Sequence, residues 1–376
     1  MSGALAIVAF LALILLVVIP IHELGHMVVA KRFGFKVTEY FVGFGPRLWS
    51  VRRGETEYGV KGIPAGGYVK IAGMNPYETV APEDVARAYG SKPLWQRALV
   101  ILSGPASHFL MGAILFMVLF ATFGVFNEDV VVVESVAPSL DGEVSPARRA
   151  GLQPGDVVVR VGDLDRPTQR ELSRYVTAYV REHPGASLEY VVERDGRRLS
   201  LAMVPKLITE DRQTRGRVGF TLGLEPVSLP EAAWLGIRST GQTVAVSVTS
   251  LDDIFGPRGL GRMATLLFTD EQRRTGDATG FIGVSQQVGD AGDRGDWGTI
   301  LAYAAYVTIF IGIVNLIPLP PLDGGHLLLL VWEGVTGRHV DYRRVVPIAA
   351  TVIVLLSLIM VAALILDVFK PVPQLT

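Results

Sequence analysis

The chain has 376 residues, of which 49% are hydrophobic and 19% charged, and this balance predicts a membrane protein rather than a soluble globular one. Its 35 Lys and Arg nearly balance 36 Asp and Glu, and no basic stripe is interleaved with aromatic residues, which argues against a nucleic-acid partner. The lack of cysteine excludes disulfides, thiolate metal sites and cysteine nucleophiles, so any metal must be bound by His, Asp or Glu.

The N-terminal segment predicts a membrane-spanning helix. Residues 3–21 carry no charge, and the apolar character continues past a polar interruption to Ala30, which is long enough to cross a bilayer. A cleaved secretory signal peptide is the alternative. It would need a basic start and a small-residue cleavage site, whereas this run has no early Lys or Arg and ends in His22 and Glu23.

The polar interruption, residues 22–26, has the pattern H-E-x-x-H. Residues four apart lie on one face of a helix, so His22 and His26 can bind one Zn²⁺ while Glu23 reaches its water. Zinc lowers the pKa of that water, and a carboxylate beside it can accept the proton and later deliver it to the leaving amine. A chance match is the alternative, but ionisable groups in an apolar span are costly in lipid and usually mark function.

Residues 34–91 predict a β-hairpin against the cytoplasmic face of the membrane. The segment is rich in Gly and aromatic residues, and two strand-like pieces, 57–60 and 68–71, flank the sequence Pro64-Ala65-Gly66-Gly67. Such a cluster of Pro and Gly predicts a turn. An ordinary cytoplasmic loop is the alternative.

Three further apolar segments, residues 98–126, 300–322 and 345–366, bring the predicted number of spans to four. Lys and Arg gather after the first span, before the second, and between the third and fourth. The positive-inside rule therefore places these ends in the cytoplasm, and both termini and the long segment 127–299 outside it.

Residues 130–205 predict a compact mixed domain. Strands are expected at 130–136, 157–161, 188–193 and 199–204, with Asp195-Gly196 as a hairpin turn. Residues 146–156, which include Gly151-Leu152 and Gly155-Asp156, resemble the helix-turn-strand signature of bacterial PDZ domains, which bind extended peptides at a sheet edge. A tight turn between unrelated elements is the alternative. Residues 230–267 are amphipathic and are expected to be helical.

Asp323 is the candidate for a third metal ligand. A catalytic zinc needs three protein ligands and an open position for water, and Asp323 is the carboxylate at the end of the third span. It follows Pro318, Pro320 and Pro321, which cannot lie inside a regular helix, so the backbone must unwind there. Irregular backbone at membrane depth is tolerated only beside protein or a polar cavity. A helix cap at the cytoplasmic boundary is the alternative role for Asp323.

The two motifs together, H-E-L-G-H at 22–26 and N-L-I-P-L-P-P-L-D-G-G at 315–325, resemble the site-2 protease family. The PDZ-like insertion between them is similar to the bacterial regulator-of-sigma-E protease branch. The resemblance implies that His22, His26 and Asp323 bind zinc and that Glu23 is catalytic. It also implies that Asn315 and the glycine-rich loop with Gly66 and Gly67 contact substrate.

His108 and the single PDZ-like unit depart from the family pattern. The second span of the family carries an Asn where this chain has His108, within Gly104-Pro105-Ala106-Ser107-His108. His108 is expected to hydrogen-bond an extended substrate, to act as a packing histidine, or to compete as a metal ligand. Better-known members have two PDZ-like units where this chain has one.

The resemblance implies an intramembrane endopeptidase in a bacterial cell membrane. Its expected substrate is a single-span membrane protein such as an anti-sigma factor that an upstream protease has trimmed. Two rival functions are a membrane-anchored PDZ scaffold with a structural zinc and a membrane-anchored zinc protease acting on soluble substrates. The expected fold is a polytopic α-helical membrane protein with a cytoplasmic-side hairpin and an extracytoplasmic PDZ-like α+β domain. The expected parts are residues 1–126 and 300–376 as the membrane core, 127–226 as the PDZ-like domain, and 227–299 as an amphipathic linker.

Overall fold

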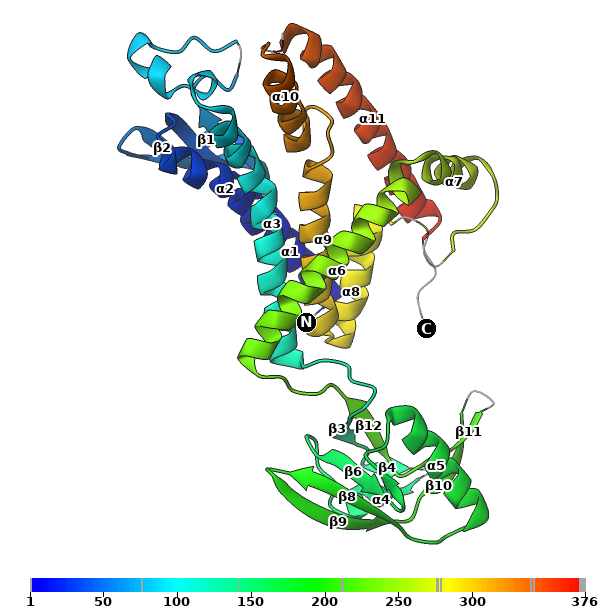
Figure 1. Cartoon of the computed structure of the whole chain (residues 1–376). Helices are drawn as coiled ribbons and strands as arrows, with labels where there is room; N and C mark the ends of the chain where they lie inside the picture. Colours follow the sequence, from blue (N-terminus) through cyan, green and yellow to red (C-terminus); the bar gives the residue numbers. More distant parts are fainter. Residues whose placement is uncertain are drawn as a thin grey trace. The chain divides into compact units, whose positions relative to one another are not determined.

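A computed structural model describes residues 2–75, 77–140, 142–210, 213–274, 277, 279–338, 340 and 342–371. The chain forms two compact units (Figure 1). One comprises Met1–Leu119 and Ala232–Thr376, and the other Phe120–Glu231. The second unit is therefore an insertion between the two halves of the first.

The first unit, in the described part of the chain, contains four helices long and apolar enough to cross a membrane, as predicted. In the last of these four helices, only 6% of the most apolar stretch is buried inside the protein. So exposed an apolar surface suits lipid rather than water. The four candidate spans are Gly3–Arg32, Leu94–Phe123, Trp297–Asn315 and Arg343–Phe369.

The helices of the first unit include several that lie outside these spans. A π-helical turn, Ile14–Val18, joins the two parts of the first span. The helices are α1 (Gly3–Leu13), α2 (Ile19–Arg32), α3 (Leu94–Phe123), α6 (Leu229–Phe255), α7 (Pro257–Phe268), α8 (Phe281–Arg294), α9 (Trp297–Asn315), α10 (Asp323–Thr336) and α11 (Tyr342–Phe369). The expected helical character of residues 230–267 is confirmed by α6 and α7.

The predicted third span, 300–322, was too long. Helix α9 ends at Asn315, and the chain is irregular until α10 begins at Asp323 (Figure 1). Three prolines cause the break, as expected, because proline lacks the backbone N–H that a helix needs. The glycines after it let the backbone turn tightly: a Cβ on Gly324 would lie 2.2 Å from the Leu316 carbonyl oxygen. Helix α10 itself was not predicted.

The predicted hairpin is present, but its turn lies elsewhere. Strands β1 (Val37–Arg53) and β2 (Thr56–Ile71) meet at Gly54, whose φ is 62°. The predicted turn at residues 64–67 was wrong, since β2 continues through it. Tyr40 pairs with Tyr58 on one side and Val69 on the other. The Pro and Gly residues therefore carry β2 from one side of β1 to the other instead of reversing it.

Small residues bring the membrane helices close together. A Cβ on Gly25 of α2 would lie 2.5 Å from the Ser103 carbonyl oxygen of α3, and one on Gly112 of α3 would lie 2.4 Å from Cγ1 of Ile309 in α9. Such close approach of backbones is typical of helix packing in membranes, where small residues replace bulky ones at the contact.

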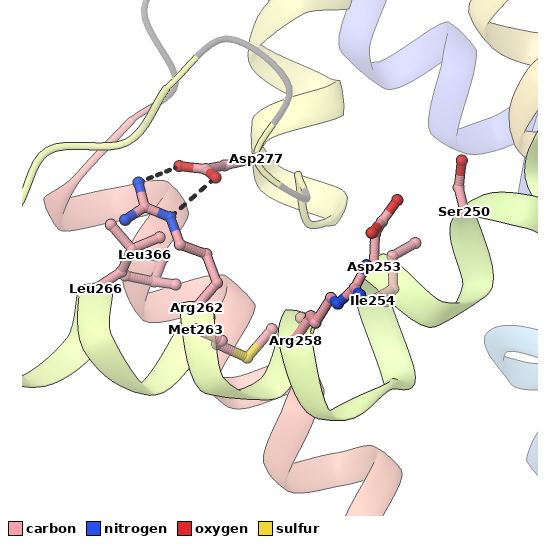
Figure 2. Close-up of a pocket in the computed structure, with 10 residues that line it drawn as sticks. Ser250, Asp253, Ile254, Arg258, Arg262, Met263, Leu266, Asp277 and Leu366 are labelled. Carbon is pink, nitrogen blue, oxygen red and sulfur yellow. Dashed lines mark hydrogen bonds and ion pairs between the residues drawn. The ribbon is translucent and has the colours of Figure 1, made fainter.

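Ion pairs connect the segment between α7 and α8 to both α7 and α11. Beside a cavity of about 350 Å³, Arg262 of α7 donates to both oxygens of Asp277 (Figure 2). These hydrogen bonds keep the pKa of Asp277 below its usual value. Arg262 also donates to Glu271. Buried Arg273 pairs with Asp367 of α11 at 2.9 Å. Arg262 is thus already neutralised by two carboxylates, which indicates a structural role.

The second unit is built on a six-stranded sheet. Its strand order is β12-β3-β6-β8-β9, with β7 beside β6, and β12 and β9 form its edges. Helix α5 (Gln169–Glu182) begins with a capping box between Thr168 and Glu171. The remaining elements are β3 (Val131–Val136), β4 (Ser139–Leu140), β5 (Glu143–Val144), α4 (Pro146–Arg149), β6 (Val157–Val161), β7 (Leu164–Asp165), β8 (Leu188–Arg194), β9 (Arg197–Met203), β10 (Lys206–Glu210), β11 (Gln213–Arg217) and β12 (Phe220–Gly223).

The four strands predicted in this unit are present as β3, β6, β8 and β9, within a few residues of the expected bounds. Asp195 and Gly196 have φ values of 49° and 73°, which fit the predicted two-residue hairpin turn between β8 and β9. Asp156 is buried and accepts hydrogen bonds from Arg194 and from the Gln153 backbone. The motif at 146–156 therefore joins α4 to β6 by a turn that an ion pair stabilises.

Candidate metal centre

Three predicted ligands converge in the first unit. His22 and His26, one turn apart on α2, and Asp323, the first residue of α10, form a group whose ligand atoms all lie within 4.8 Å of one another. Asp323 Oδ2 is 3.3 Å from His22 Nε2 and 3.5 Å from His26 Nε2, and the two imidazole nitrogens are 3.1 Å apart. No other such group occurs among the residues that the structure describes.

These distances fit a zinc ion. In a tetrahedral site with bonds of about 2.0 Å, neighbouring ligand atoms are about 3.3 Å apart. The Asp323 Oδ2 atom is buried and has no hydrogen-bond donor among the described residues, and a carboxylate oxygen in that state calls for a cation. A donor set of two imidazoles and one carboxylate suits zinc and leaves a fourth position open.

The backbone of α3 orients His26. The His26 Nδ1 atom lies 2.7 Å from the Val100 carbonyl oxygen. Because a carbonyl only accepts, Nδ1 carries the proton and the Nε2 lone pair is free for metal. Neither this carbonyl nor the Val69 N–H described below was predicted, because backbone groups leave no signal in the identity of the side chain.

Gly104 leaves space for both imidazoles. A Cβ built on it would lie 2.3 Å from His26 Nε2 and 2.7 Å from His22 Cε1. Gly104→Ala is therefore expected to displace the imidazoles and to weaken zinc binding by about tenfold to a hundredfold, as other changes beside metal ligands do. Gly241→Ala is the matched control, since nothing lies within 4 Å of its added Cβ. Zinc titration of both variants checks this, and wild-type affinity in Gly104→Ala would contradict it.

Glu23 of α2 faces the hairpin. Its Oε2 accepts a hydrogen bond from the Val69 backbone N–H at 3.0 Å, and its carboxylate interacts electrostatically with both histidines and with Asp323. Residues 67–71 of β2 pair with β1 on one side only, and the other side of this strand is the edge of the hairpin that faces Glu23. The Glu23 carboxylate, the three candidate metal ligands and a sheet edge thus meet at one place.

His108 lies beside the candidate metal ligands but outside their group. Its ring is fully buried, with its centroid 5.0 Å from that of His22. Its Nδ1 has no hydrogen-bond partner among the described residues. Gly312 of α9 accommodates it, since a Cβ there would lie 2.8 Å from the His108 Cβ.

The other predicted site residues fall at two places. Gly66 and Gly67 belong to β2, and a Cβ on Gly67 would lie 3.6 Å from the Glu23 Cγ. Gly66 has a φ of 126°, which a residue with a side chain rarely adopts. Asn315 is the half-buried last residue of α9, just before the irregular segment that leads to Asp323.

Known proteins match nearly the whole chain. The family described as Peptidase family M50 matches residues 10–360. Zinc metalloprotease Rip1 of Mycobacterium tuberculosis (strain ATCC 25618 / H37Rv) is 31% identical, over 97% of this chain and 98% of that protein. Rip1 of Mycolicibacterium smegmatis is 32% identical over 99% of each chain. Metalloprotease MmpA of Caulobacter vibrioides is 29% identical, over 90% of this chain and 89% of that protein.

The family match agrees with the four apolar helices and with the group of two histidines and an aspartate. The relatives extend over almost the full chain at similar identity, so the likeness is not confined to the H-E-x-x-H motif. The chain belongs to peptidase family M50, the site-2 protease family, and is a zinc metalloprotease of the membrane.

Proposed function

We propose that the protein is an intramembrane endopeptidase that hydrolyses a peptide bond within the membrane-spanning segment of its substrate. His22, His26 and Asp323 hold the zinc, and Glu23 is the general base and acid. The observation that carries this proposal is the convergence of the three ligand atoms, 3.1 to 3.5 Å apart, from α2 of the first span and from α10 after the third.

The chemistry follows from the polar groups around this point. Zinc held by these three residues would leave a position open for a water molecule and would lower the pKa of that water toward neutrality. Glu23 accepts the proton as the peptide carbonyl is attacked and delivers it to the leaving amine. The Val100 carbonyl keeps His26 in the required tautomer. Asn315 and His108 contribute polar groups toward the substrate backbone.

The hairpin holds the substrate in an extended form. A transmembrane helix hides its peptide bonds in its own hydrogen bonds, so a segment must unwind before its carbonyl can be attacked. Strand addition to residues 67–71 would replace the lost hydrogen bonds, with Gly66 and Gly67 leaving room for the added backbone. The hydrogen bond from the Val69 N–H to Glu23 supports this, because it places the open edge beside the general base.

The substrate in this proposal is a single-span membrane protein, such as an anti-sigma factor trimmed by an upstream protease. The protein lies in the plasma membrane of a bacterium. Both termini and the PDZ-like domain of residues 127–226 lie outside the cytoplasm. This domain recognises or screens substrates, while residues 227–299 link it to the second half of the membrane core, residues 300–376.

Co-expression with candidate single-span proteins tests this function. The wild-type enzyme should release a fragment cut within the span, and Glu23→Gln should not. A cut outside the span would favour a membrane-anchored protease of soluble segments. If Glu23→Gln behaves like the wild type in this assay, the rival interpretation as a membrane-anchored PDZ scaffold is favoured, in which zinc is structural and Glu23 plays no part in catalysis.

Cysteine labelling tests the topology. Asp163 and Arg338 are both exposed, and the chain contains no cysteine, so a cysteine introduced at either position is a unique label. An impermeant thiol reagent applied to spheroplasts should modify Asp163→Cys and spare Arg338→Cys, because the basic residues beside the spans favour the cytoplasm. After lysis, both should react equally. Labelling of Arg338→Cys alone in intact spheroplasts would invert the proposed orientation.

A further inference from the structure

A groove runs between helix α5 and the edge strand β12 in the second unit; we call it the α5–β12 groove. Its deeper part has a volume of about 320 Å³. The floor is apolar, because Leu172, Val176, Tyr190 and Val218 are all buried there. Phe220 and Leu222 of β12 complete the apolar lining, and Leu222 is 40% exposed.

One wall of the groove is an open sheet edge. Strand β12 pairs with β3 on one side and ends the sheet on the other. At one end of the groove, β11 lies against α5, where the Gly216 N–H donates to Thr177 Oγ1 at 2.9 Å. A free strand edge above an apolar floor is the feature by which proteins add an extended peptide to a sheet.

The other wall carries a row of arginines. Arg170, Arg174 and Arg181 are exposed residues of α5, and their spacings of four and seven place them on one helix face. Together with Arg215 of β11 they line the outer part of the groove, about 630 Å³ in volume. No carboxylate is among the described residues that line either part of the groove.

Two carboxylates, Glu128 and Glu171, partly neutralise this row. Glu128 lies 3.8 Å from Arg170, but both side chains are more than half exposed, and such pairs contribute little. The Glu171 carboxylate accepts hydrogen bonds from the N–H and hydroxyl of Thr168 at 2.9 Å, so it caps the helix, and its charge also attracts Arg174. Three arginines thus face two partly shared carboxylates, so the row keeps positive charge that a ligand can use.

We propose that the α5–β12 groove binds an extended acidic peptide segment. The peptide backbone adds to β12, its apolar side chains enter the floor, and its carboxylates face Arg170, Arg174 and Arg181. This inference rests on the proposed peptide-recognition role of residues 127–226 and names the class of peptide. The open edge and the apolar floor favour a peptide over an anionic lipid surface, which would need neither.

The test uses the full chain in nanodiscs of phosphatidylcholine and short fluorescent peptides that alternate valine with aspartate, asparagine or lysine. Fluorescence anisotropy at low salt should show the aspartate peptide binding about tenfold more tightly than the asparagine peptide, since three exposed charge pairs act together. The difference should nearly vanish at about 1 M salt, where charges are screened within about 3 Å.

Variants assign the effect to this groove. Arg174→Glu with Arg181→Glu should reverse the preference in favour of the lysine peptide. Arg197→Glu with Arg198→Glu is the matched control on β9 at the opposite edge of the sheet, and it should keep the preference for aspartate. Ser173→Trp fills the groove from an exposed position and should abolish binding of every peptide, whereas Ser173→Ala should not.

Three results would overturn the inference. Equal binding of the aspartate and asparagine peptides, lost in Ser173→Trp, would refute recognition of acidic residues and leave a peptide groove. Binding of no peptide would refute the peptide-recognition role as well, but not the zinc protease, which the Glu23 variant tests separately. The third result has two parts: the aspartate and asparagine peptides bind equally, and the arginine variants lose affinity for phosphatidylglycerol vesicles. It would show that the arginine row binds lipid rather than peptide.

Discussion

Glu23→Gln is expected to lower turnover by at least about a hundredfold while zinc remains bound. Glutamine keeps the size of the side chain but does not accept a proton from the attacking water. It still offers an oxygen to the Val69 N–H, 3.0 Å away in the wild type, so the hairpin should stay in place. Cleavage of a reconstituted membrane substrate, measured beside zinc content by elemental analysis, checks both parts of this expectation.

Glu83→Gln is the control for the Glu23 variant. Glu83 is exposed in a short 3₁₀ turn, Pro82–Arg87, so the Glu83→Gln variant should retain full activity. If Glu23→Gln cleaves nearly as fast as wild type, Glu23 is not the general base. If it loses zinc as well as activity, the carboxylate supports the metal site, and the assignment of proton transfer would have to be withdrawn.

Asp323→Asn should remove both zinc and activity. The carboxylate oxygen that lies 3.3 and 3.5 Å from the two imidazole nitrogens becomes a neutral amide, which is a poor zinc ligand. Loss of one of three ligands is expected to weaken zinc binding by at least about a hundredfold, more than changes in residues that only support ligands. Zinc titration and the cleavage assay on the same preparation measure the two effects.

His108→Asn separates the two possible third ligands. His108 lies outside the group formed by His22, His26 and Asp323, so its asparagine variant should keep zinc. The opposite pattern, with zinc retained in Asp323→Asn and lost in His108→Asn, would make His108 the third ligand. Asp163→Asn, an exposed position in the second unit, controls for loss of a carboxylate elsewhere.

The local patterns in the sequence were sufficient for the elements that depend on them. Apolar runs predicted all four spans, because lipid requires a long uninterrupted hydrocarbon surface. Alternating strands and the Asp195-Gly196 turn predicted the framework of the second unit. The spacing of His22 and His26 predicted that their imidazoles would meet, because helical residues four apart share a face.

Two element boundaries were predicted wrongly. The Pro64–Gly67 cluster predicted a turn, but pairing of Tyr40 with partners on both sides keeps β2 extended through it. The third span was drawn to residue 322, although the prolines in it end the helix at Asn315. For β2, pairing with a distant strand overrode the local turn signal. For α9, the prolines remove hydrogen bonds within the helix itself, so the helix ends before them.

The sequence by itself determined the residue types of the candidate metal centre, since a chain without cysteine offers zinc only imidazoles and carboxylates. The tertiary structure decided their surroundings. It brought Asp323 of α10 to the histidines of α2, the Val100 carbonyl to His26 and the Val69 N–H to Glu23. Backbone donors and acceptors are the same in every residue, so only packing of α2, α3 and the hairpin selects which of them reach the site.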